Sequence, residues 1–203
     1  MKIICVGRNY AAHASELNNP VPQEPVLFMK PDTAIPQART PFYIPGFSND
    51  VHHEVELVLK INKMGKNIAE KFAGNYYSEI AVGIDFTARD LQSKLKEKGL
   101  PWEKAKAFDG SAPVSAFISI DELGDKNNLS FKLIKNKEEI QKGNSKDLLF
   151  SFDKLIAHIS QYFTLKKGDL IFTGTPAGVG KVEAGDKLEA YIEDKLMLKV
   201  NVK

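Results

Sequence analysis

The sequence has little cysteine and no long apolar run. Its single cysteine, Cys5, excludes a disulfide within the chain and a zinc site built from cysteines. We interpret it as a small buried residue of a first strand. No apolar run approaches the roughly 18 residues that a membrane helix needs, and the first run stops at Val6, too early for the core of a signal peptide. These absences predict a cytoplasmic protein with no membrane partner.

An excess of charge of one sign is also lacking. The 203 residues include 28 lysines and arginines against 26 aspartates and glutamates, a formal net charge of +2. This balance gives no case for a nucleic-acid partner. Hydrophobic residues make up 43% and charged residues 27%, which is typical of a globular protein. With no internal repeat or low-complexity tract, we predict one catalytic domain spanning residues 1–203.

Short runs rich in Val, Ile and Phe recur between Gly, Pro, Asn and Asp, which is the pattern of strands. They predict strands at residues 2–6, 25–30, 51–61, 78–84, 115–119, 129–135, 169–172 and 187–202. Helical periodicity is limited to residues 10–17, 87–98 and 152–163. The fold class is therefore mixed β with few helices.

Several segments between these runs have specific interpretations. We interpret Thr87 as the N-cap of its helix, with Asp90 completing a capping-box-like pair. The proline-containing segment 32–50 is expected to be a long loop over or beside a site. Residues 121–128 and 138–146 are polar and are predicted to form surface turns.

Carboxylates at alternate positions mark the run His52-His53-Glu54-Val55-Glu56. In a strand, Glu54 and Glu56 share one face about 7 Å apart, whereas His53 points to the other face and is not expected to be a ligand. Two ionised carboxylates at this spacing repel each other and need a divalent cation or basic side chains as compensation. A solvent-facing strand edge is an equally consistent interpretation.

Asp85 follows the buried-strand run at residues 80–84. It either caps the next helix or joins Glu54 and Glu56 in an all-oxygen site. Hard oxygen ligands favour Mg²⁺, Mn²⁺ or Ca²⁺ over zinc or copper, and three carboxylates leave about three octahedral positions for water or substrate. Open positions suit catalysis.

Two further features have a chemical and a structural interpretation. His13 and Glu16 are three residues apart on a predicted helix, so they form either a carboxylate-oriented base that activates water or an ordinary surface pair. Lys106 lies between Ala105 and Ala107, which predicts partial burial. A buried ammonium needs an anionic partner, such as a substrate carboxylate or enolate.

Arg89 and Gln92 either share a helix face beside Asp85 or are solvated. The segment Thr-Gly-Thr-Pro-Ala-Gly-Val-Gly at 173–180 offers N–H and O–H groups to an anion, or is a structural turn. Its spacing matches neither a Walker A loop nor a dinucleotide fingerprint.

In this order and spacing, the segments resemble the fumarylacetoacetate hydrolase family. The resemblance is close to its short single-domain branch, which includes acylpyruvases and oxaloacetate decarboxylases. The motifs that carry the resemblance are Gly7-Arg8-Asn9-Tyr10, residues 24–31, 52–57, 83–90, 99–102, 106–109 and 173–180. It implies a β-roll like the C-terminal domain of fumarylacetoacetate hydrolase, and a homodimer.

The resemblance also implies roles for individual residues. The metal ligands would be Glu54, Glu56 and Asp85, holding Mg²⁺ or Mn²⁺, with Ca²⁺ possible in a crystal. His13 and Glu16 would be a water-activating catalytic pair on a lid, and Lys106 a third catalytic residue. The substrate-binding residues would be Arg8, Arg89, Gln92 and Thr175.

The activity expected from this resemblance is metal-dependent hydrolysis of the C–C bond of acylpyruvates through a metal-chelated pyruvate enolate. The alternative is an oxaloacetate decarboxylase or a 2-oxo acid isomerase or tautomerase that uses the same enolate. In either case the partner is a small 2-oxo acid. A third hypothesis, a non-catalytic β module that holds structural Ca²⁺, is disfavoured by the presence of His13, Glu16 and Lys106 beside the carboxylates.

Overall fold

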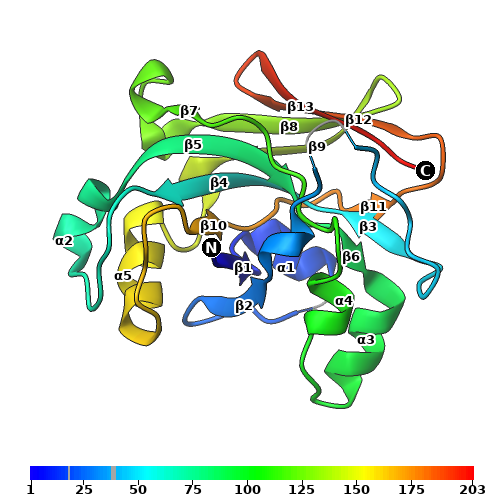
Figure 1. Cartoon of the computed structure of the whole chain (residues 1–203), viewed down its shortest axis with the longest axis horizontal. Coiled ribbons are helices and arrows are strands. Elements are labelled where there is room, and N and C mark those ends of the chain that lie inside the picture. Colours follow the sequence, from blue (N-terminus) through cyan, green and yellow to red (C-terminus); the bar gives the residue numbers. More distant parts are fainter. Residues whose placement is uncertain (18, 38–39) are drawn as a thin grey trace.

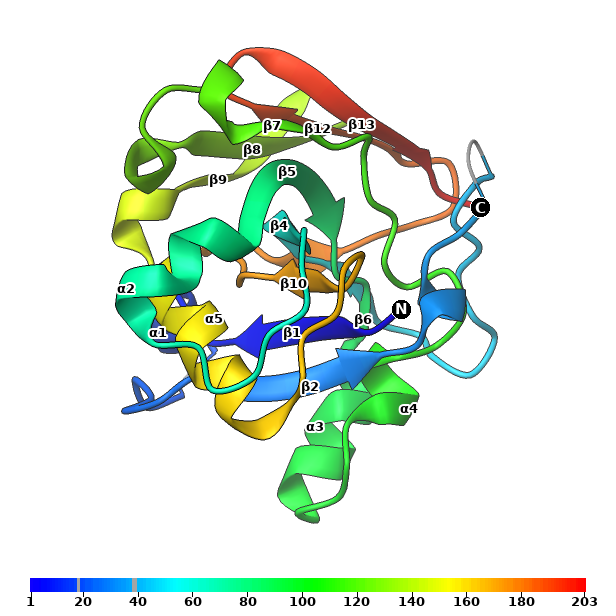
Figure 2. The same ribbon diagram turned by 60° about the vertical axis from the view of Figure 1, so that its left-hand side comes forward.

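The structure is a computed structural model that describes residues 1–17, 19–37 and 40–203. Its largest sheet has six strands in the order β2-β1-β10-β4-β5-β7. These strands are β1 (Ile3–Gly7), β2 (Val26–Lys30), β4 (Val55–Ile61), β5 (Tyr77–Ile84), β7 (Ile118–Ser119) and β10 (Leu170–Phe172). Strands β1 and β10 pair in parallel, and the other neighbours in this sheet are antiparallel. Figure 2 shows the sheet curling into a roll.

Two smaller sheets complete the roll. A four-stranded sheet has the order β13-β12-β8-β9 and lies across β4 and β5 (Figure 1). Its strands are β8 (Ser130–Lys135), β9 (Glu138–Asn144), β12 (Lys187–Ile192) and β13 (Lys195–Asn201). A three-stranded sheet joins β11 (Gly180–Lys181), β3 (Val51–His53) and β6 (Thr87–Ala88).

The helices are few and lie outside the sheets (Figure 1). They are α1 (Ala11–Glu16), α2 (Glu70–Ala73), α3 (Arg89–Glu97), α4 (Glu103–Lys106) and α5 (Phe152–Tyr162). Single 3₁₀ turns are η1 (Asp32–Ala34), η2 (Gly74–Tyr76), η3 (Ile120–Glu122), η4 (Lys126–Asn128) and η5 (Ser145–Asp147). Among the residues that the structure describes, no helix is long and apolar enough to cross a membrane.

Strand β4 is buried on both faces, and this explains where the site lies. Leu57 and Leu59 pack into the large core. Val58, on the opposite face, packs in a second cluster with Cys5 and Phe172, so the predicted burial of Cys5 is confirmed. Since side chains alternate along a strand, Glu56 lies on the same face as Val58, and it is buried there.

The predicted sheet-dominant fold with few helices is confirmed, but several boundaries were wrong. The predicted strand 51–61 is interrupted at Glu54, and β3 and β4 belong to different sheets. The predicted strand 187–202 is a hairpin of β12 and β13. Segment 138–146 contains β9, which pairs with β8, instead of a surface turn. Polar residues on the exposed face of β9 conceal the strand in the sequence.

The predicted cap of α3 was also wrong. Thr87 pairs with His52 as part of β6, so the helix begins at Arg89 after Ala88, which makes no side-chain cap. Asp90 instead accepts hydrogen bonds from Ser48 Oγ at 2.7 Å and from the backbone N–H of Asn49 at 3.2 Å. The irregular segment 32–50 thereby contacts the start of α3; its residues 38–39 lie outside the described residues.

Candidate active site

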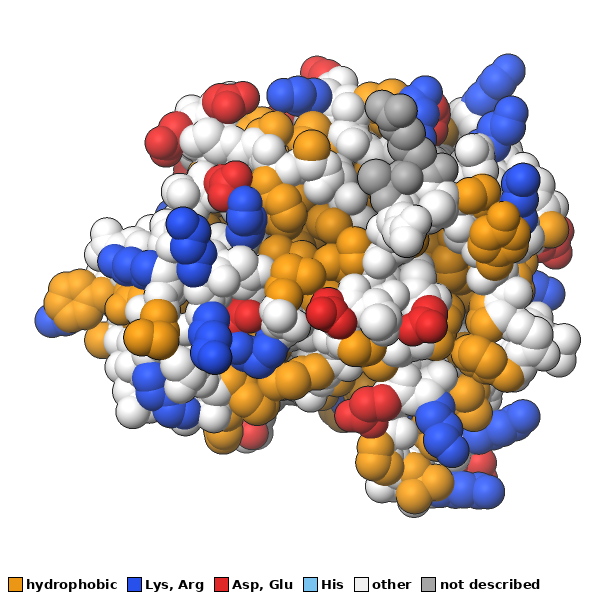
Figure 3. Space-filling model, viewed as in Figure 1, with side chains coloured by type: hydrophobic (Ala, Val, Ile, Leu, Met, Phe, Trp, Pro, Cys, Tyr) orange, Lys and Arg blue, Asp and Glu red, His pale blue; other side chains and the backbone are white. Residues whose placement is uncertain are grey.

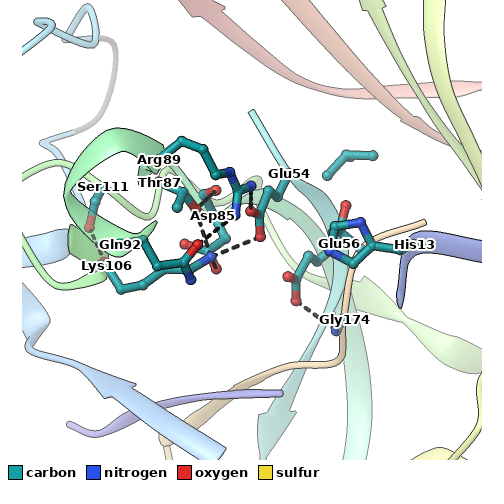
Figure 4. Close-up of polar contacts among 12 residues, drawn as sticks. His13, Glu54, Glu56, Asp85, Thr87, Arg89, Gln92, Lys106, Ser111 and Gly174 are labelled. Carbon is teal, nitrogen blue, oxygen red and sulfur yellow. Dashed lines mark hydrogen bonds and ion pairs between the residues drawn. The ribbon is translucent and has the colours of Figure 1, made fainter. Parts of the chain in front are cut away.

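Pairing of β4 with β5 brings the three predicted metal ligands together. Glu56 lies opposite Gly83 in the register, and the N–H of Asp85 donates to the carbonyl of Glu54 at 2.8 Å. A Cβ at Gly83 would lie 2.7 Å from the Phe172 ring, so this position needs glycine. The result is a buried cluster in which Glu54, Glu56 and Asp85 each have an oxygen within 4.8 Å of the others (Figure 4).

Basic side chains enter the cluster from three elements. Lys106 at the end of α4 places Nζ 2.8 Å from Glu54 Oε2, 2.7 Å from Asp85 Oδ2 and 2.6 Å from Thr87 Oγ1. Arg89 of α3 donates to Glu54 Oε1, and Lys30 Nζ of β2 lies 2.8 Å from Asp85 Oδ1.

These contacts correct the interpretation of Lys106. Its burial is almost complete, at 3% exposed, and its anionic partners are the carboxylates of the site itself. Lys30, also buried, was missed by the sequence reasoning. The available signal was a lysine that directly follows the apolar run Val26–Met29.

The pKa values of the buried groups in the cluster are shifted in different directions. Burial raises the pKa of Glu54, but the charges of Lys106 and Arg89 outweigh it and hold that pKa well below its usual range. Burial and the Asp85 charge raise the pKa of Glu56, although the N–H of Gly174 opposes this. Burial lowers the pKa of Lys106, but Asp85 and Glu54 more than reverse this, so its pKa is raised and it stays an ammonium.

The donor set fits a divalent cation. In the described part of the chain, Glu56 has no basic partner. Asp85 Oδ1 receives no hydrogen bond of good geometry from the described residues despite its proximity to Lys30. A buried carboxylate without a counter-charge is costly. Three converging carboxylates offer the oxygen ligands that Mg²⁺ and Mn²⁺ prefer.

The predicted pair of His13 and Glu16 is present on α1. His13 is buried, and its Nδ1 lies 3.3 Å from Glu16 Oε2. Glu16 Oε1 accepts from the backbone N–H of Gly178 at 3.0 Å. A carboxylate on Nδ1 leaves Nε2 as the imidazole nitrogen available for proton transfer. Figure 4 shows the His13 ring beside Glu56.

Nine of the ten predicted site residues line one pocket. The tenth, Glu16, contacts the lining residue His13. The predicted substrate-binding residues Arg8, Arg89, Gln92 and Thr175 all line it. Gln92 Oε1 accepts from Arg89 Nη1 at 2.6 Å. In the 173–180 segment, the N–H of Gly174 donates to Glu56 Oε2 at 2.7 Å, so the anion that this N–H binds is a side chain of the site.

Gln141 of β9 was also missed, because its segment was predicted to be a surface turn. It is buried, and its Oε1 accepts from the N–H of Val55 at 3.1 Å and lies 2.9 Å from His53 Nδ1. Its Nε2 donates to Thr175 Oγ1 and to the carbonyl of Pro176, both at 3.0 Å. His53 is thereby a satisfied core residue, and burial lowers its pKa to about 4.

Comparison with known proteins identifies the class. The family model "Fumarylacetoacetate (FAA) hydrolase C-terminal" matches residues 2–203, and the chain belongs to this family of enzymes. The fold agrees: fumarylpyruvate hydrolase from Pseudomonas aeruginosa, solved in complex with Mn²⁺ and pyruvate, superposes with a TM-score of 0.94. That protein is 37% identical, and the match covers 100% of this chain and 89% of the other.

Two similar relatives carry more specific names. Oxaloacetate tautomerase YcgM of Escherichia coli (strain K12) is 46% identical over 188 residues, which is 92% of this chain and 86% of the relative. Oxaloacetate tautomerase FAHD1, mitochondrial, of Bos taurus is 42% identical over 200 residues, which is 98% of this chain and 90% of the relative.

Proposed function

We propose that this chain is a divalent-cation-dependent enzyme that interconverts the keto and enol forms of oxaloacetate. The observation that carries the proposal is the buried cluster of Glu54, Glu56 and Asp85, with Lys106 and His13 in the same pocket. The relatives called oxaloacetate tautomerase favour this activity, which was the alternative in the sequence analysis, over the acylpyruvate hydrolysis expected first.

Glu54, Glu56 and Asp85 would hold Mg²⁺ or Mn²⁺. A bound cation would supply Lewis acidity toward the 2-oxo group of the substrate. The neighbouring structure with Mn²⁺ and pyruvate supports a 2-oxo acid as the bound group. Arg89, Gln92 and Thr175 orient the substrate from the walls of the pocket.

The chain's own residues account for the proton transfer. His13, oriented by Glu16, removes a proton from C3 of the keto form. The electron pair of that C–H bond becomes the C=C bond, and the carbonyl pair moves onto oxygen. Because Glu54 and Asp85 keep Lys106 protonated, this ammonium stabilises the developing negative charge and does not act as the base. The proton that His13 took from C3 is then returned to the oxygen, directly or through water, which completes the enol, and the reverse steps give the keto form.

The test follows the decay of the ultraviolet absorbance of freshly dissolved enol-oxaloacetate, with and without the protein. We expect the protein with Mg²⁺ to accelerate ketonisation beyond Mg²⁺ alone, and His13→Ala to lower the rate by about a hundredfold or more, since general acid–base catalysis typically contributes about 10²- to 10⁴-fold. Addition of EDTA should remove the acceleration. A rate that is indifferent to EDTA and to His13→Ala would contradict the proposal.

Hydrolysis of acylpyruvates is the second candidate, and the contact between His13 and Glu16 favours it. Such a pair suits removal of a proton from water, after which hydroxide attacks the distal carbonyl and pyruvate leaves. A pyruvate assay with acetylpyruvate and with oxaloacetate separates the reactions. Tautomerisation releases no pyruvate, hydrolysis releases it from acetylpyruvate only, and decarboxylation releases it from oxaloacetate.

A further inference from the structure

The mouth of the pocket carries cations that the proposed chemistry does not use. Arg8 and Lys96 line the pocket together with Arg89. Arg8 directly follows β1 with φ of 60°, in the left-handed region. That conformation is uncommon for a residue with a side chain, and it persists only where the surrounding structure holds it. Such strain at a pocket rim is typical of a side chain held for binding.

Helix α3 supplies the second cation. Arg89, Gln92 and Lys96 are spaced i, i+3 and i+7, so they lie on one helix face, and all three line the pocket. At one end of this row Arg89 contacts Glu54 in the acidic cluster. At the other end Lys96 Nζ donates to Asn19 Oδ1 at 2.8 Å. The row therefore leads from the cluster outward to the mouth.

The cations at the mouth lack compensation from the protein. Throughout the described ranges, no ion pair includes Arg8 or Lys96. Burial and the charges of Arg8 and Arg89 lower the pKa of Lys96, so the three groups repel one another. Like charges gathered at a pocket mouth raise the local concentration of anions and favour their binding.

We propose that Arg8 and Lys96 bind the distal carboxylate of a dicarboxylic 2-oxo acid, so that the enzyme selects dianionic substrates over monoanionic ones with the same head. This rests on the proposed function, which binds the 2-oxo acid head at Glu54, Glu56 and Asp85. The side chains of Phe28 and Trp102 line the same pocket and supply apolar contact for the carbon chain.

The kinetic test compares oxaloacetate with its 4-ethyl ester, which lacks only the distal charge. The measured quantity is the ratio of kcat/KM for oxaloacetate to kcat/KM for the ester. We expect wild type to prefer oxaloacetate at least tenfold, and Arg8→Gln and Lys96→Gln each to reduce that ratio at least fivefold. Lys96→Arg should retain it. A general structural loss lowers both kcat/KM values and leaves the ratio unchanged.

Lys94→Gln is the matched control, because Lys94 is an exposed lysine of the same helix that does not line the pocket. It should keep the wild-type ratio. If wild type converts both compounds with equal kcat/KM, or if the ratio is the same in all variants, the subsite is wrong while the proposed function stands.

A binding measurement keeps the subsite testable without turnover. Calorimetry in Mg²⁺ compares N-oxalylglycine, which has a distal carboxylate, with oxamate, which has the same head and no tail. We expect wild type to bind N-oxalylglycine at least tenfold more tightly than oxamate. Lys96→Gln should lose this difference in affinity, and Lys94→Gln should keep it. Equal affinities in wild type would overturn the subsite. If wild type binds N-oxalylglycine more tightly than oxamate but does not accelerate the ketonisation of enol-oxaloacetate, only the proposed reaction is wrong.

Discussion

At the residue scale, the ammonium of Lys106 connects two carboxylates that would otherwise repel each other. It lies 2.8 Å from Glu54 and 2.7 Å from Asp85, and all three groups are buried. Removal of one partner from a buried ion pair leaves an uncompensated charge and typically costs about 3–5 kcal/mol. A divalent cation bound by the same carboxylates would replace part of the lost positive charge.

We therefore predict that Lys106→Met destabilises the protein strongly in EDTA and much less in Mg²⁺. Urea unfolding in both conditions measures the effect. The gain in the free energy of unfolding from Mg²⁺ should be larger for the variant than for wild type. Lys104→Met, on the exposed side of the same helix, is the control. Equal gains in wild type and Lys106→Met would argue against a cation on these carboxylates.

At the scale of elements, the sequence predicted most strands because apolar runs and turn residues are local signals. Strand periodicity and a strand end allowed Glu54, Glu56 and Asp85 to form one acidic cluster, and the family resemblance implied that they do. The break of the strand at Glu54 could not be predicted. It depends on the pairing of β3 with β6 and β11, and on Gln141 binding the N–H of Val55, which are contacts between distant segments.

Gln141 links β9 to the pocket, and a substitution that keeps its shape tests this role. Gln141→Glu retains the acceptor for Val55 but loses the donors to Thr175 and Pro176. We expect KM to rise about tenfold with a smaller change in kcat, because Thr175 loses its orientation. Steady-state kinetics measures the changes in KM and kcat separately. Glu139→Gln, at an exposed position on the same strand, should behave as wild type. A fall in kcat alone would contradict a positioning role.

The parallel pair β1 and β10 has its own acid-sensitive contact. Asp169 is buried and accepts hydrogen bonds from the backbone N–H of Lys2 at 2.9 Å and of Lys166 at 2.8 Å. Burial raises the pKa of Asp169, but these bonds and the Lys2 ammonium outweigh it and lower that pKa below its ordinary value. The folded state therefore favours the ionised carboxylate.

The resulting contribution to stability is complete above the unfolded-state pKa of about 4 and is lost as pH falls through the folded pKa. We predict that Asp169→Asn lowers the free energy of unfolding at pH 7 by about 1–3 kcal/mol, the usual range for a lost buried hydrogen-bond partner. The difference from wild type should shrink steadily below pH 4 in urea titrations. A difference that is constant down to pH 3 would show that the carboxylate's charge is not involved.

At the scale of the whole molecule, the roll leaves one face with a marked pattern. Apolar side chains gather in its centre, over β4 and β10, while charged side chains lie around the edge (Figure 3). An apolar patch with a polar rim is typical of an interaction surface. The homodimer expected from the family resemblance stays a prediction: light scattering should give twice the mass of one chain, and a single-chain mass at micromolar concentration would contradict it.

The sheets bring the three carboxylates of Glu54, Glu56 and Asp85 together, and the central claim is that they bind a divalent cation. The most direct test of this claim is calorimetric titration of the metal-free protein with Mn²⁺. We predict one cation per chain in wild type. Affinity should fall at least a hundredfold in Glu56→Gln, which keeps the side-chain shape and the acceptor for Gly174. That variant should be at least as stable as wild type in EDTA, since burial and Asp85 disfavour the Glu56 charge. Unchanged Mn²⁺ affinity in Glu56→Gln, or no binding to wild type, would contradict a metal centre at this cluster.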